Sequence, residues 1–171
     1  MHGPWRKDGP RLPVEFARTS SGGRLTLVLA DNTPRVTVLW TELSVATLDK
    51  ARRALAEREG IKEKNISRDI GCWNAGIGDA GNLTAEVGAW AAAKEITGVV
   101  WTALPVKFGK ESRAPSAEEA VEYLAMLPES KKTVAEEYVR KAPVQIRTPF
   151  RGIFERKFGW TPISDQRRLL A

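Results

Sequence analysis

The sequence predicts an α+β fold, with a mixed β-sheet or small barrel, flanking helices and a C-terminal helical extension. Three observations lead to this prediction. Short strand-like runs occupy the N-terminal part, helical patterns and a further apolar run fill residues 44–104, and helical patterns alone fill about 115–160. From the length we expect a single domain over 1–171, with its core at about 8–105.

The N-terminal part contains the expected strands. RLTLVLA at 24–30 alternates in character, and RVTVLWTEL at 35–43 is rich in β-branched and aromatic residues. The turn sequence DNTP at 31–34 separates them, so we expect an antiparallel hairpin. LPVEFAR at 12–18 alternates weakly and could be another strand, whereas residues 1–13 begin as an irregular arm rich in Pro and Gly.

The middle of the chain predicts two helices and a strand. The first helix runs from Ser44, which can cap it, to Gly60, which ends it. Residues 70–82 are rich in glycine and indicate a loop, with room for a short strand at its start. A second helix is expected at 83–96, and the apolar run GVVWTAL at 98–104 predicts a central strand covered on both faces.

The C-terminal part predicts three helices. Ser116 is the cap of the first, and Glu119 stands at the capping-box position three residues later. Pro128 begins the second helix, because proline is tolerated only at a helix start. TPFRGIFERKF at 148–158 suggests a short final helix.

The composition excludes several kinds of site. A single cysteine, Cys72, allows no internal disulfide and no metal site built on paired cysteines. The single histidine, His2, leaves a nucleophilic dyad almost without a base. We therefore expect neither a metal nor a cofactor. No apolar run approaches the roughly eighteen residues of a membrane span, and the N-terminus lacks a signal peptide's apolar middle, so we expect no membrane partner and a cytoplasmic location.

The net charge of +6 and the pI of about 9.7 keep a nucleic-acid partner in view. The basic residues form no dense run of the kind that binds RNA or directs localisation. A solvated basic face is therefore favoured over a nucleic-acid surface, which stays an alternative. The most basic part of the chain contains Arg140, Lys141, Arg147, Arg151, Arg156, Lys157, Arg167 and Arg168.

A glycine pattern in the middle of the chain matches the dinucleotide-binding fingerprint G-x-G-x-x-G. It consists of Gly76, Gly78 and Gly81, and a helical pattern follows it. A dinucleotide site requires a firm strand before the first glycine and an acidic residue at the end of the next strand. CWNA precedes the pattern and residues 98–104 contain no acid, so we expect a plain loop.

A strand ending in VLW at 38–40, a helix containing leucines, the pair Glu59-Gly60 and the later run GVVWTAL follow one another in this order. This arrangement resembles the gamma-glutamylcyclotransferases and their relatives, over roughly residues 8–105. The resemblance implies an enzyme that releases 5-oxoproline from a small γ-glutamyl amine or peptide without a metal or cofactor.

The resemblance also implies the site residues. Glu59 matches the family's catalytic glutamate, which takes a proton from the substrate's α-ammonium and returns it to the leaving amine. Burial would have to raise its pKa toward the working pH. Glu42, two residues after Trp40, is a second carboxylate that could face the same cavity. Trp40 and Trp101 could line the substrate pocket, with core packing as the alternative for both.

Other interpretations stay open. Glu59 also suits a solvated carboxylate at a helix end, and Glu15 and Glu42 suit exposed strand positions. The family's Tyr-Gly-Ser loop has no counterpart in this chain, which favours a non-catalytic binding or interaction protein on the same fold. A sheet without its first strand would have an open edge that a second copy could cover, so a homodimer is a further expectation.

Overall fold

The computed structural model describes residues 3–76 and 83–163 of the chain. Helices and small antiparallel sheets make up this part, which confirms the α+β prediction. The sheets have two and three strands, and neither closes into a barrel within the described residues. The barrel form of the prediction is therefore wrong, because too few strands pair to close one.

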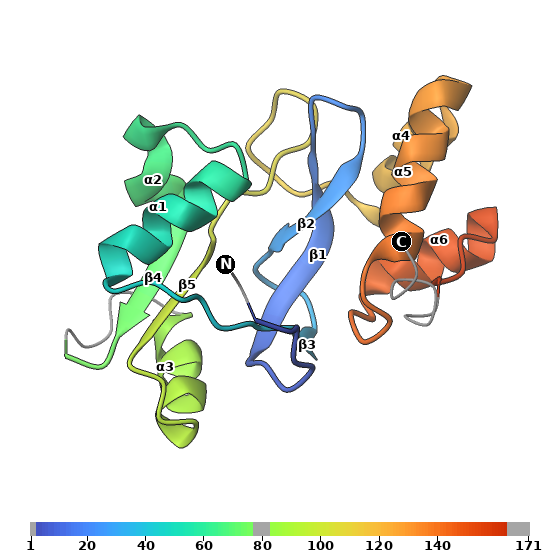
Figure 1. The fold of residues 1–171 in the computed structure, drawn as a ribbon. Coiled ribbons are helices and arrows are strands. Elements are labelled where there is room, and N and C mark those ends of the chain that lie inside the picture. The colour runs from blue at the N-terminus through green and yellow to red at the C-terminus, as the bar shows by residue number, and fades with distance from the viewer. Residues whose placement is uncertain (1–2, 77–82, 164–171) are drawn as a thin grey trace. The chain divides into compact units, whose positions relative to one another are not determined.

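The chain divides into two compact units, and each is built from two separate segments (Figure 1). Unit 1 combines Met1–Leu12 with Thr37–Leu104. Unit 2 combines Pro13–Val36 with Pro105–Ala171. Because each unit is discontinuous in sequence, a reading of consecutive patterns alone does not separate them. The single-domain expectation stays a prediction.

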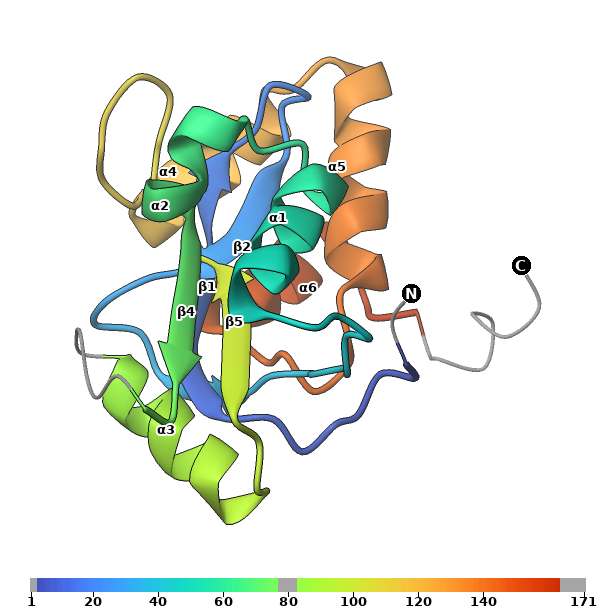
Figure 2. The ribbon, with the colours of Figure 1, turned by 60° about the vertical axis from the view of Figure 1, so that its left-hand side comes forward.

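Unit 1 is built around a two-stranded antiparallel sheet of β4 (Ile70–Asn74) and β5 (Gly98–Thr102), which lie side by side in Figure 2. Its helical elements are α1 (Leu48–Arg58), a 3-10 turn at Glu63–Asn65, α2 (Ile66–Asp69) and α3 (Thr84–Ala93). Both α1 and α3 contact the two strands. The sheet and these two helices therefore form the centre of the unit.

Helix α1 begins later than the sequence pattern suggests. Thr47 is extended and its side chain accepts a hydrogen bond from the Lys50 backbone N–H at 3.2 Å. Thr47 therefore caps the helix, and the prediction of Ser44 as the cap is wrong. The other end follows the prediction: Gly60 has a φ of 66°, a left-handed conformation that suits glycine, and it ends the helix.

Two tryptophans of the sheet pack onto glycines. Trp101 lies opposite Gly71 across the strand pair, and a side chain on that glycine would overlap the indole ring. Trp73 approaches Gly88 of α3, where a Cβ atom would lie 2.6 Å from its Nε1. The glycines therefore let large rings lie close to backbone, which makes up for the small size of the sheet.

Strand β5 is an edge strand. Among the described residues its one neighbouring strand is β4, and its residues are exposed at Gly98 and half-buried from Val99 to Thr102. The prediction of a central strand covered on both faces is therefore wrong. An apolar run suits a strand beside a groove as well as one inside a sheet, so the pattern alone does not separate the two.

Unit 2 is built on a three-stranded sheet in the order β2-β1-β3. Its strands are β1 (Arg11–Thr19), β2 (Leu25–Leu29) and β3 (Arg35–Thr37). The hairpin joins β1 and β2, and its turn is closed by hydrogen bonds between Ser20 and Arg24. The predicted hairpin between 24–30 and 35–43 is wrong, because β3 ends after three residues and Val38 bonds instead to Pro10.

Strand β1 is buried on both faces near its middle. The register against β2 shifts between Phe16 and Arg18, and three successive residues, Glu15 to Ala17, are buried. Regular alternation would expose one of each adjacent pair, so the expectation of an exposed Glu15 is wrong. Its carboxylate accepts hydrogen bonds from the backbone N–H of Phe16 at 2.8 Å and of Phe150 at 3.1 Å.

The three predicted C-terminal helices are confirmed. They are α4 (Ala117–Ala125), α5 (Glu129–Lys141) and α6 (Pro149–Phe158). The capping box of α4 is also present, since Ser116 and Glu119 exchange their backbone and side-chain hydrogen bonds. Buried apolar residues from the hairpin and these helices form the core of unit 2, including Phe16, Leu25, Leu124, Val139, Phe154 and Trp160.

Arg151 of α6 is buried and holds the end of α5. Its guanidinium donates hydrogen bonds to four backbone carbonyl oxygens, at distances from 2.7 to 3.3 Å. The last carbonyl groups of a helix carry partial negative charge and have no hydrogen-bond donor within the helix. A guanidinium at this end supplies both positive charge and hydrogen-bond donors. The four acceptors belong to Val139, Ala142, Pro143 and Ile146.

Candidate functional site

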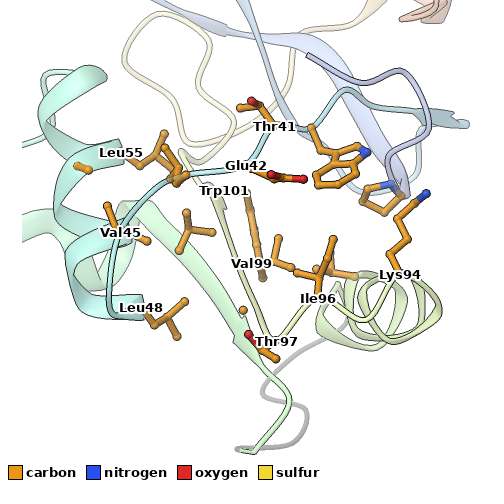
Figure 3. Close-up of a pocket in the computed structure, with 18 of the residues that line it drawn as sticks. Thr41, Glu42, Val45, Leu48, Leu55, Lys94, Ile96, Thr97, Val99 and Trp101 are labelled. Carbon is orange, nitrogen blue, oxygen red and sulfur yellow. The ribbon is translucent and has the colours of Figure 1, made fainter. Parts of the chain in front are cut away.

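A groove of about 1270 Å³ runs along β5 in unit 1 (Figure 3). It is lined by α1, by the segment 38–47 that leads into α1, by all of β5 and by residues 94–97 that precede β5. The four residues predicted for the site, Trp40, Glu42, Glu59 and Trp101, all line this groove. Residues from three separate parts of the sequence therefore meet at one concave surface.

Polar and apolar atoms contribute about equally to the surface of the groove. In Figure 3, Leu48 and Leu55 of α1 stand on one side of Val99 and Trp101, and Ile96 stands on the other. Charged side chains at the margin include Glu42 and Lys94. Apolar side chains could bind the apolar part of a ligand, and the polar groups could fix its orientation.

The N-terminal arm forms part of the groove wall. Residues 3–10 run alongside 38–42, and Arg6 and Trp40 exchange backbone hydrogen bonds of 2.8 and 3.1 Å. Gly9 donates to the carbonyl of Val38 at 3.1 Å, and a side chain on this glycine would overlap that carbonyl. The arm that the sequence predicts as irregular is therefore held in place by regular pairing.

Asp8 connects the arm to two other elements. Its carboxylate accepts hydrogen bonds from Trp40 Nε1 at 2.8 Å and from Lys94 Nζ at 2.6 Å, and its backbone carbonyl accepts one from Trp90 Nε1 at 2.8 Å. The hydrogen bond from Lys94, followed by that from Trp40, lowers the pKa of Asp8 to about 2. Asp8 therefore remains ionised under all ordinary conditions.

Sequence reasoning missed Asp8, Lys94 and Trp90 as parts of this site. Their connection joins positions more than 80 residues apart, since Asp8 bonds to both Trp90 and Lys94. The local signal of Asp8, an Asp-Gly pair in a Pro-rich arm, indicates only a turn. The unusual number of tryptophans is the one feature that could have directed attention to the arm, because a buried indole N–H needs an acceptor.

Glu42 lies at the rim of the groove. Its carboxylate pairs with Arg6 at 2.6 Å, and its side chain is 63% exposed. The same guanidinium lies over the ring of Trp40, 4.6 Å from its centroid. Glu42 and Trp40 are thus joined through one arginine, which fixes the position of both.

Glu59 is the residue after the last turn of α1. Its carboxylate lies 3.4 Å from Arg58 Nε, and its side chain is 35% exposed. The carboxylate therefore faces water at the margin of the groove. The mechanism implied by the resemblance would require this group to work from a solvated position.

Within residues 3–76 and 83–163, no group of three or more His, Cys, Asp or Glu side chains could hold a metal ion. In the same ranges no helix has the length and apolarity needed to cross a membrane. Gly78 and Gly81 of the glycine pattern lie outside the described residues.

Some of the basic residues in the C-terminal part form ion pairs or are buried. Arg140 pairs with Glu136 at 2.9 Å, Lys141 pairs with Glu137, and Arg151 is buried. These contacts reduce the positive charge that the helices present to a partner. Nucleic-acid binding stays a prediction.

Comparison of the chain with protein families, with curated proteins and with solved structures finds no match.

Proposed function

We propose that the protein is a non-catalytic binding protein and that the groove along β5 is its ligand site. The observation that carries this proposal is the groove of about 1270 Å³, whose surface combines apolar side chains of α1 and β5 with polar and charged side chains. The charges at the rim are paired, as in Arg6–Glu42 and Lys94–Asp8, so they contribute more to shape than to attraction of an ion. In this proposal the protein acts in the cytoplasm.

The proposal predicts that a charge placed inside the groove weakens binding of an apolar probe. Val45 lines the groove and is 39% exposed, so the variant Val45→Asp should still fold. Binding of an apolar probe would remove water from the new carboxylate, which costs free energy. We expect the affinity for the uncharged dye Nile red, measured by fluorescence titration, to fall about tenfold, or about 1.4 kcal/mol.

Val134→Asp is the matched control, because Val134 is 43% exposed and lies on α5 in unit 2. It should leave the affinity for Nile red unchanged. Equal affinities in both variants and the wild type would show that the dye binds elsewhere and would contradict the proposed site.

A second candidate function is γ-glutamyl cyclisation, which the resemblance implies. The observation that favours it is that Glu59, Glu42, Trp40 and Trp101 line one groove. In this reaction the α-amine of a γ-glutamyl peptide attacks the γ-carbonyl carbon. The new C–N bond closes 5-oxoproline while the old C–N bond breaks. Glu59 would accept the ammonium proton and return it to the leaving amine.

The cyclisation hypothesis predicts release of 5-oxoproline from γ-glutamyl dipeptides, measured by chromatography. Glu59→Gln should lower the rate by a factor on the order of 100 or more, because the amide cannot take a proton. Glu57→Gln is the control, since Glu57 is an exposed carboxylate on the same helix. If the wild type releases no 5-oxoproline, the cyclisation hypothesis is wrong. If the wild type and Glu59→Gln release it at equal rates, Glu59 is not the acid/base of the reaction.

A further inference from the structure

We propose that the groove takes an extended apolar peptide segment, which adds to the open edge of β5 as a third strand. This inference rests on the proposed binding function and names the class of ligand. Strand addition to a sheet edge combines backbone hydrogen bonds with side-chain pockets on alternating sides. Three features of unit 1 support it: the unpaired edge, the apolar walls and the paired charges.

The first feature is the hydrogen-bonding edge of β5. In the antiparallel pair with β4, Ala75 donates to Thr97 at 3.1 Å and Ala103 donates to Asp69 at 2.7 Å. Hydrogen-bonded pairs alternate along such a ladder, so the backbone groups of Val99 and Trp101 also face β4. The backbone groups of the alternate residues must therefore point away from β4; these residues are Gly98, Val100 and Thr102.

This outward edge has no strand beside it among the described residues, and it lies along the groove. Unpaired backbone donors and acceptors in a row are a template for another strand. A small organic ligand would satisfy one or two of these groups, whereas an extended peptide would satisfy the whole row. The edge therefore selects for a peptide backbone.

The second feature is the pair of apolar walls. Leu48 of α1 lies against one face of β5, since its Cδ1 would be 3.3 Å from a Cβ atom on Gly98. Val99 and Trp101 point to the opposite face, because side chains alternate along a strand. Both walls line the groove. A strand added here would place successive side chains against opposite walls, so the fitting peptide is apolar at adjacent positions.

The third feature is the pairing of the basic residues that line the groove. Its basic residues each have an acidic partner: Arg6 pairs with Glu42, Arg58 with Glu59, and Lys94 with Asp8. A nucleic acid or a highly charged peptide would gain little from such a surface. The segment 38–47 also walls the groove opposite β5, which suits one extended chain better than the sheet edge of a second copy.

The test uses a fluorescein-labelled peptide of sequence Lys-Val-Ala-Val-Leu-Val-Ala-Lys, with binding measured by fluorescence anisotropy. Val100→Pro removes one outward N–H and puts a ring in its place, and proline is tolerated at an edge where the N–H faces away from the sheet. Val100→Thr keeps the N–H and a side chain of similar shape. We expect Val100→Pro to weaken binding about tenfold or more and Val100→Thr to change it less than about twofold.

A second measurement guards against misfolding of Val100→Pro. The same peptide with every central amide N-methylated cannot donate backbone hydrogen bonds, and it should fail to bind wild-type protein. Circular dichroism and tryptophan fluorescence check that both variants keep the wild-type fold. If Val100→Pro does not fold, loss of binding on methylation alone supports strand pairing.

The outcomes separate this inference from the proposed function. Nile red binding that Val45→Asp weakens, combined with no peptide binding, would overturn strand addition and leave the groove as a ligand site. Peptide binding that neither Val100→Pro nor methylation weakens would also overturn it. A dimer that Val100→Pro dissociates, in a protein that does not bind the peptide, would assign the edge to a second copy instead. Failure of both the dye and the peptide would overturn the proposed function as well.

Discussion

At the scale of single residues, Glu15 shows how burial of both faces of a strand changes the chemistry of a side chain. Its carboxyl group is buried in unit 2, where it accepts a hydrogen bond from the backbone N–H of Phe150 at the start of α6. Burial raises the pKa of Glu15, although hydrogen bonds from Thr148, Phe16 and Phe150 oppose the shift. A buried carboxylate at a helix N-terminus is stabilised by the backbone N–H groups that it accepts from.

This shift predicts a pH dependence of stability. Because the folded pKa lies above the unfolded value of 4.5, the folded state holds the proton that the unfolded state has released. The free energy of unfolding should therefore fall as the pH rises from about 4.5 through the folded pKa. Glu15→Gln has no titrating group at this position. The free energy of unfolding of the wild type minus that of the variant should therefore decrease over this pH range.

Urea unfolding at pH values from 4 to 7 would measure this difference, which should change by about 1.4 kcal/mol per unit of pKa shift. Glu122→Gln is the control, because Glu122 is exposed on α4. The difference in the free energy of unfolding between the wild type and this variant should not fall with pH as it does for Glu15→Gln. A difference that is flat, or that grows with pH, would contradict the assignment of Glu15 as the titrating group.

At the scale of elements, local signals in the sequence predicted most helices correctly. The capping box at Ser116 and the proline near the start of α6 act within one turn, so they can be read without knowledge of the fold. The start of α1 was misplaced because Ser44 and Thr47 can both cap. Only the extended backbone at Thr47 decides between them.

Strand pairing was harder to predict, because it depends on which segments compete for an edge. SSGG and DNTP both suit turns, but only the first joins paired strands, since residues beyond β3 pair with the N-terminal arm. The candidate site was only partly predictable for the same reason. Trp40, Glu42, Glu59 and Trp101 line one groove, yet Asp8, which fixes its wall, depends on contacts distant in sequence.

At the scale of the whole molecule, the question is whether the net charge of +6 has a partner. Many basic side chains in both units are held by acidic neighbours, including Arg53 by Asp49 and Glu63, and Arg113 by Glu111 and Glu119. Such pairs weaken the field that a polyanion would meet. Among the described residues, these ion pairs offset part of the positive charge in each unit.

This distribution predicts weak, salt-sensitive binding of nucleic acid. A labelled 20-nucleotide DNA or RNA should bind detectably, if at all, only at low salt, because counterion release is the main driving force when no specific contacts form. In electrophoretic mobility shifts at 50 and 200 mM salt, we expect any complex to be lost at the higher concentration. A heat-denatured sample of the protein provides the control for charge alone. A complex that survives 200 mM salt and distinguishes one sequence from another would instead require a built nucleic-acid surface, and the C-terminal helices would be the first place to look for it.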